Sequence, residues 1–110
     1  MSEFKSPRKR FGQNFLQDQN IINKIIAAIA PQENDNIIEI GPGRGALTYP
    51  LVEKLKQLHV IEIDRDLVSW WQQKKIATLH LHENDALKVD ICSIIPEQRC
   101  RIVGNLPYNI

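Results

Sequence analysis

Short apolar runs alternate with amphipathic stretches along this chain. Two stretches, 45–57 and 65–75, have apolar residues at helical spacing. The apolar runs have the length and composition of buried strands, and they are 37–40, 60–63, 79–82 and 101–104. Residues 86–98 are irregular or weakly helical. Strands that alternate with helices in this way predict an α/β fold with a parallel sheet and right-handed crossovers.

A further helix is predicted before the first strand. Asp18 has the side chain of an N-cap, and Pro31 stops the helix after Ala30. Its apolar residues follow helical spacing, and they are Ile21, Ile22, Ile25, Ile26 and Ile29. In the next helical stretch Pro50 lies inside the span, so that helix begins near Pro50 or kinks there.

A glycine-rich segment follows the first strand, with Gly41, Gly43 and Gly45 at alternate positions. A turn from strand to helix needs positive φ or close approach of the backbone to a ligand, and glycine permits both. The dinucleotide fingerprint G-x-G-x-x-G would need glycine at Ala46. The loop therefore suits S-adenosylmethionine, which has no phosphate, and Glu39 is expected to reach its amino acid end through backbone or water. A turn without a ligand is the alternative.

Acidic residues follow the second and third strands. Glu62 lies 21 residues after Gly41, near the offset at which a carboxylate accepts hydrogen bonds from ribose hydroxyls. We expect it to bind the cofactor, because its neighbours Ile61 and Ile63 resemble strand core. Asp85 is either an acceptor for the adenine amino group of the cofactor or a turn residue, since Asn-Asp pairs favour turns.

The last strand runs into Asn105, Leu106, Pro107 and Tyr108. Binding sites of open α/β sheets lie at the carboxyl ends of the strands. The side-chain oxygen of Asn105 and a backbone carbonyl of Leu106 or Pro107 can each accept one hydrogen of a substrate amino group. Tyr108 offers a face on which a base can stack. These four residues are predicted to be catalytic, in methyl transfer to the exocyclic nitrogen of a base.

Composition and charge refine this picture. The chain has 110 residues, 43% of them hydrophobic and 25% charged, as in one soluble domain. Residues 1–10 carry four basic residues against one acidic residue and are expected to form a disordered basic arm, either merely solvated or binding RNA phosphates. No apolar run is long enough for a membrane helix. Cys92 and Cys100 fit no metal spacing, and we expect no metal.

With these motifs in hand, residues 8–110 resemble the ribosomal RNA adenine dimethyltransferases that modify small-subunit RNA. Five segments in order carry the resemblance, and they are Gly12–Leu16, Gly41–Thr48, Glu62–Asp66, Asn84–Leu87 and Asn105–Ile110. It implies a Rossmann-like S-adenosylmethionine-dependent methyltransferase with strand order 3-2-1-4 and flanking helices. Residues 11–110 would be the N-terminal part of that domain, and the chain is expected to be truncated and inactive alone.

The resemblance also assigns site residues and partners. It implies cofactor contacts through the N-terminal loop, the strand ends and the tetrapeptide, at Gln13, Asn14, Leu16, Gly41, Gly43, Glu62, Ile63, Asp85, Ala86 and Asn105. The partner would be small-subunit (16S) ribosomal RNA in the pre-30S particle, dimethylated on adenine N6 in the cytoplasm by a monomeric enzyme during ribosome biogenesis. The alternatives are a large-subunit RNA adenine methyltransferase, a non-catalytic RNA- or nucleotide-binding relative, and a dehydrogenase.

Overall fold

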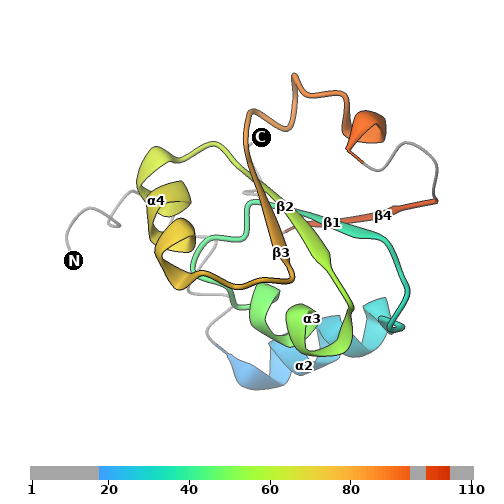
Figure 1. Ribbon diagram of the computed structural model, residues 1–110. Coiled ribbons are helices and arrows are strands. Elements are labelled where there is room, and N and C mark those ends of the chain that lie inside the picture. Colours follow the sequence, from blue (N-terminus) through green and yellow to red (C-terminus); the bar gives the residue numbers. More distant parts are fainter. Residues whose placement is uncertain (1–17, 95–98, 105–110) are drawn as a thin grey trace.

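The computed structural model describes residues 18–94 and 99–104, which form a parallel four-stranded sheet with helices packed against it (Figure 1). In chain order the elements are α2 (Gln19–Ile29), β1 (Ile37–Ile40), α3 (Thr48–Lys54), β2 (Leu58–Glu62), α4 (Arg65–Lys74), β3 (Leu79–Glu83), the 3-10 turn η2 (Ile91–Ser93) and β4 (Arg101–Gly104). The strand order is β3-β2-β1-β4, and every pairing is parallel. The predicted fold class and sheet order are therefore confirmed.

The core lies between the two central strands and the helices. Both faces of β1 and β2 are buried, as expected for the inner strands of a parallel sheet, whereas β3 and β4 are partly exposed edge strands. Helices α2 and α3 lie together below the sheet in Figure 1. They bury branched side chains against one face of the sheet, and the buried cluster includes Ile22, Ile26, Leu51, Leu55, Ile37, Leu58 and Val60.

Local sequence accounts for where the helices begin and end. The Asp18 side chain caps α2 by accepting from the Asn20 amide at 2.8 Å, as predicted, and the helix ends at Ile29 before Pro31. Helix α3 is shorter than the predicted 45–57, because the glycine loop continues through Leu47. Pro50 falls in the first turn of α3, where its missing N–H costs nothing.

Strand β2 ends one residue before the predicted boundary. The strand was expected to include Ile63 as core, but that side chain is 62% exposed and the expectation is wrong. The Glu62 carboxylate accepts from the amides of Ile63 and Asp64, at 3.1 and 3.0 Å. These bonds turn the backbone away from the ladder, so Ile63 points out of the sheet.

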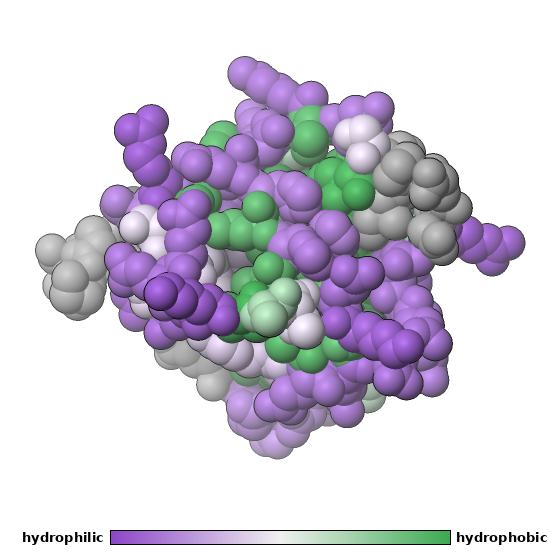
Figure 2. Space-filling view, viewed as in Figure 1, coloured by the Kyte–Doolittle hydropathy of each residue, from purple (hydrophilic) through white to green (hydrophobic). Residues whose placement is uncertain are grey.

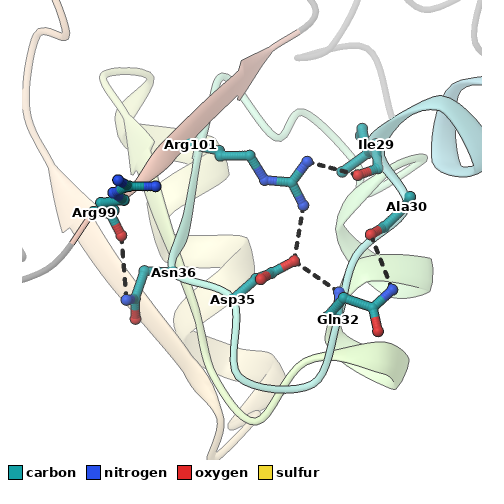
Figure 3. Close-up of polar contacts among 7 residues, drawn as sticks. All are labelled: Ile29, Ala30, Gln32, Asp35, Asn36, Arg99 and Arg101. Atoms are coloured by element: carbon teal, nitrogen blue, oxygen red, sulfur yellow. Dashed lines mark hydrogen bonds and ion pairs between the residues drawn. The ribbon is translucent and has the colours of Figure 1, made fainter.

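Arg101 ties β4 to the connection between α2 and β1 (Figure 3). Its guanidinium donates to the Ile29 carbonyl at 2.7 Å and to the Asp35 carboxylate at 2.8 Å. The same Asp35 oxygen accepts from the Gln32 amide at 2.7 Å. A cation at the last carbonyls of α2 also complements the helix dipole. Residues more than sixty positions apart are thereby held at one end of the sheet.

The viewed surface is mostly hydrophilic, with small apolar areas between charged and polar side chains (Figure 2). Within residues 18–94 and 99–104, the exposed large apolar side chains are Tyr49, Ile63, Leu87 and Ile102. Ile63 follows β2 directly, and Leu87 lies in the turn after β3. None of the helices described is long and apolar enough to cross a membrane.

Candidate functional site

The glycine loop leaves the carboxyl end of β1 with all three glycines at positive φ. The angles are 68° at Gly41, 55° at Gly43 and 95° at Gly45, a region that side chains disfavour. The Gly41 amide donates to the Ile61 carbonyl at 2.9 Å, which holds the start of the loop against β2. The Gly45 amide donates to the Pro42 carbonyl at 2.9 Å and closes a turn. The loop is therefore a folded backbone surface without side chains at three positions.

Glu62 ends β2 beside this loop and is only 6% exposed. Burial raises the pKa of its carboxyl group, and the nearby charge of Asp64 acts in the same direction. Hydrogen bonds from the backbone amides of Asp64, Gly43 and Ile63 oppose that rise in pKa. The carboxylate thus lies between its own turn and the glycine loop. A carboxylate in this position can accept hydrogen bonds from hydroxyl groups of a ligand lying on the loop.

Asp64 and Asp66, which follow Glu62, are charges of the loop and of the helix start. Asp64 is the N-cap of α4, and its Oδ1 accepts from the amides of Asp66 and Leu67 at 2.9 and 3.3 Å. The sequence therefore distinguishes Glu62, at the strand end, from the acidic residues that start the next helix.

Glu39 lies below the loop and is 1% exposed. Its Oε1 accepts from the Thr48 hydroxyl at 2.6 Å, and Thr48 is the first residue of α3. Burial raises the pKa of Glu39 to about 7, the Thr48 hydrogen bond opposes the rise, and the charge of Glu62 adds to it. The side chain therefore connects β1 to α3 inside the fold. Sequence reasoning did not single out Thr48. A hydroxyl residue at the start of the helix that follows a strand with a glutamate could have indicated this hydrogen bond.

Exposed apolar side chains follow the strand ends of β2 and β3. Ile63 is 62% exposed and Leu87 is 83% exposed. Ala86, between Asp85 and Leu87, is half-buried. Sequence reasoning placed Ile63 in the strand core and did not assign Leu87 a role. Exposed apolar side chains next to a buried carboxylate suit a ligand that carries both a ring and hydroxyl groups.

Asp85 forms a turn. Its amide donates to Asn84 Oδ1 at 2.8 Å, and its own Oδ1 accepts from the Leu87 amide at 2.9 Å. Its carbonyl accepts from the amides of Lys88 and Val89, both at 2.9 Å. The turn interpretation of Asp85 is therefore confirmed, and contact with a cofactor base stays a prediction. The Asn84 amide also donates to the Glu62 carbonyl at 3.0 Å, which joins this turn to the end of β2.

The remaining predicted site residues lie outside the described part of the chain. They are Gln13, Asn14 and Leu16 in the N-terminal segment, and Asn105, Leu106, Pro107 and Tyr108 after β4. Their roles stay predictions.

Three histidines gather on neighbouring strands away from this site. The rings of His59 and His80 stack with centroids 4.6 Å apart, and His59 Nδ1 lies 3.0 Å from His82 Nε2. Burial lowers the pKa of His59 to about 4 and also lowers that of His82. Within the described ranges no group of three or more histidine, cysteine, aspartate or glutamate side chains is arranged to hold a metal ion.

Comparison with known families adds to this geometry. A family model described as "Ribosomal RNA adenine dimethylase" matches residues 4–110. Three proteins named ribosomal RNA small subunit methyltransferase A are similar to this chain. That of Legionella pneumophila is 58% identical over 96% of the chain. That of Aromatoleum aromaticum is 55% identical over 100%, and that of Alcanivorax borkumensis is 50% identical over 94%. The chain spans only 41, 41 and 38% of these relatives, respectively.

Two solved structures are similar over 84% of the chain. A dimethyladenosine transferase from Plasmodium falciparum has a TM-score of 0.67 and 28% sequence identity, and the match covers 34% of it. The 23S rRNA methyltransferase ErmE has a TM-score of 0.69 and 29% identity, and the match covers 37% of it. The fold of the described residues is thus shared by a dimethyladenosine transferase and by a 23S rRNA methyltransferase.

Proposed function

Because this chain belongs to the ribosomal RNA adenine dimethylase family, we propose that it forms the N-terminal, cofactor-binding part of an S-adenosylmethionine-dependent enzyme. The proposed reaction is dimethylation of adenine N6 in small-subunit (16S) ribosomal RNA. The proposed partner is that RNA in the pre-30S particle, which the enzyme would meet in the cytoplasm as a monomer. The names of relatives that are 50–58% identical support this choice of RNA.

The observation that carries the proposal is the pairing of the glycine loop with Glu62. Three glycines at positive φ expose backbone against which a nucleoside can lie, and the loop needs no phosphate ligand. Glu62 is held in place by the amides of Ile63 and Asp64, so its orientation is fixed before a ligand arrives. We assign it to the ribose hydroxyls. Gly41 and Gly43 would contact the cofactor through their backbone.

The adenine of the cofactor would lie beyond Glu62. Ile63 and Ala86 would flank the ring, and Asp85 would accept from its amino group. The exposure of Ile63 supports this assignment. Its large apolar side chain is 62% exposed, and removing it from water under a flat ring would be favourable. Glu39 is assigned a supporting role under the loop, because its carboxyl group is bound to Thr48 and buried.

The substrate side of the reaction rests on residues outside the described ranges. When bound, S-adenosylmethionine supplies a methyl group on a sulfonium centre. The side chain of Asn105 and the carbonyls of Leu106 and Pro107 would accept the hydrogens of the adenine amino group and so orient its nitrogen lone pair. Tyr108 would stack on the base, which must leave its helix to reach the site. Orientation of this kind is the main contribution a protein makes to direct transfer. Gln13, Asn14 and Leu16 would close over the cofactor.

The test is calorimetric titration of S-adenosylmethionine into the full-length protein that carries this segment. Loss of a hydrogen bond to a charged acceptor weakens binding about tenfold to a hundredfold, so Glu62→Gln should raise the dissociation constant by that factor. Glu83→Gln, at the exposed end of β3, is the matched control and should bind like the wild type.

Activity is measured in the same protein by transfer of labelled methyl groups to unmethylated ribosomal RNA. Label on adenine N6 of the small-subunit RNA is expected. Label on the large-subunit RNA alone would show that the assigned substrate is wrong. A folded wild type that does not bind S-adenosylmethionine would overturn the whole proposal.

A further inference from the structure

We propose that Trp71 is a positioning residue for the cofactor loop, an inference that rests on the proposed function. Trp71 belongs to α4 and is far from the loop in sequence. Its indole N–H nevertheless donates to the Gly43 carbonyl at 2.9 Å. In Figure 1, α4 lies beside the segment that follows β1. The bond fixes the peptide group at the centre of the glycine loop.

Gly43 connects Trp71 to Glu62. Trp71 donates to its carbonyl at 2.9 Å, and the Gly43 amide is among the backbone groups that oppose the rise in the pKa of the Glu62 carboxyl group. A glycine at φ 55° has no side chain to restrict it, so the bond from Trp71 helps to select its conformation. Glu62 is the proposed ribose acceptor. Trp71 therefore affects cofactor binding through the position of the loop, and we assign it no direct contact with the cofactor.

The ring of Trp71 also explains why residue 45 is glycine. A Cβ at Gly45 would lie 2.8 Å from Trp71 Cη2 and 2.6 Å from Tyr49 Cε2. The two aromatic rings themselves pack with centroids 5.4 Å apart. The φ of 95° at Gly45 disfavours any other residue independently of this contact. The loop and the aromatic pair thus fit each other closely.

Burial separates the two adjacent tryptophans. Trp71 is 2% exposed, and its N–H has a protein acceptor. Trp70 is half-buried, meets Trp71 edge-on at 4.9 Å, and has the Lys74 ammonium 4.4 Å from the centre of its ring. Trp70 donates no hydrogen bond to the loop in the described structure. It therefore provides a matched control for Trp71 on the same helix.

The first experiment compares Trp71→Phe with Trp70→Phe in the full-length protein that carries this segment. A neutral hydrogen bond corresponds to roughly a 2- to 12-fold change in an equilibrium constant, so Trp71→Phe should raise the dissociation constant and KM for S-adenosylmethionine by that factor. The turnover number at saturating cofactor should change less than about twofold, because the bond supports ground state and transition state alike. Trp70→Phe should alter neither quantity.

The second measurement is made on the wild type, and it needs only one of the two variants to fold for the assignment. In a proton–nitrogen NMR spectrum, the indole N–H signal of Trp71, assigned by its loss in Trp71→Phe or its persistence in Trp70→Phe, should shift when S-adenosylmethionine is added. The signal of Trp70 should stay in place.

Three outcomes overturn the inference, and they differ from one another. If Trp71→Phe melts at a lower temperature but binds cofactor as tightly as the wild type, Trp71 is structural only. If the Trp71 signal does not shift while the wild type binds cofactor, cofactor binding does not change the hydrogen bond between Trp71 and the loop. If the folded wild type does not bind cofactor at all, the proposed function fails and this inference fails with it.

Discussion

The buried carboxyl group of Glu39 should make the fold less stable as pH rises. Its pKa is raised from 4.5 to about 7 in the folded chain, so between these values the folded state binds more protons than the unfolded state. Stability from this group is fully present below pH 4.5 and is lost as pH rises through 7. Between pH 5 and pH 8 the loss is on the order of 2 to 3 kcal/mol, since one pKa unit corresponds to about 1.4 kcal/mol.

Glu39→Gln removes the titrating group while keeping its volume and an acceptor for the Thr48 hydroxyl. The assay is urea unfolding of the full-length protein at pH 5 and pH 8, followed by tryptophan fluorescence. Any cost of the amide that does not depend on pH cancels when each variant is compared with the wild type at both values. The variant should gain on the order of 2 to 3 kcal/mol in free energy of unfolding relative to the wild type on going from pH 5 to pH 8.

The comparison with the wild type is necessary because His59 acts in the opposite direction. Its pKa is lowered from 6.5 to about 4, so the stability it contributes is present above pH 6.5 and is lost as pH falls towards 4. The wild type alone can therefore show little net dependence on pH. Glu53→Gln, exposed on α3, is the matched control and should follow the wild type. If the free energy of unfolding of Glu39→Gln also differs from that of the wild type by the same amount at both pH values, ionisation of Glu39 does not destabilise the fold and the reasoning is refuted.

Two further predictions concern the elements that frame the site. Asp64→Ala removes the N-cap of α4 and should lower the free energy of unfolding by about 1 kcal/mol, as measured by urea unfolding. Asp66→Ala should lower it less, because Asp66 does not cap the helix. Equal losses for the two variants would contradict the capping role. Arg101→Met should lower the free energy of unfolding by about 1 kcal/mol, because the ion pair with Asp35 is partly exposed. In 1 M salt the difference between the variant and the wild type should be smaller. A difference that salt does not change would contradict an electrostatic origin.

The sequence predicts the parallel sheet and most strand positions because the inner strands are mostly apolar, and the family resemblance adds the strand order. Ile37 and Ile38 point to opposite faces of β1, and both are fully buried. Such a strand needs layers on both sides and parallel neighbours, which the alternation of elements supplies. Glu62 is singled out by its offset from Gly41 and by its place at the end of an apolar strand, and its contact with a cofactor stays a prediction.

Other features depend on contacts that no local pattern shows. Ile63 continues an apolar run, yet the Glu62 side chain binds the next two amides and ends the strand there. The bond from Trp71 to Gly43 joins residues 28 positions apart, and the apolar spacing of α4 shows only that one of its two tryptophans is buried. The sequence does not show that the Glu39 carboxyl group accepts from Thr48 inside the fold, and the predicted contact of Glu39 with the cofactor through backbone or water stays a prediction.

The register of β4 against β1 places the end of β4 beside the start of the glycine loop. Ile40 pairs with Gly104, and a Cβ at Gly104 would lie 3.1 Å from the Ile40 carbonyl oxygen, so glycine lets the two strands end close together. The chain therefore leaves β4 beside the point where it enters the glycine loop. Arg101, at the other end of β4, anchors that strand to the start of β1 through Asp35. The same pairing of β1 with β4 thus sets the distance between the cofactor loop and the start of the segment proposed to hold the base.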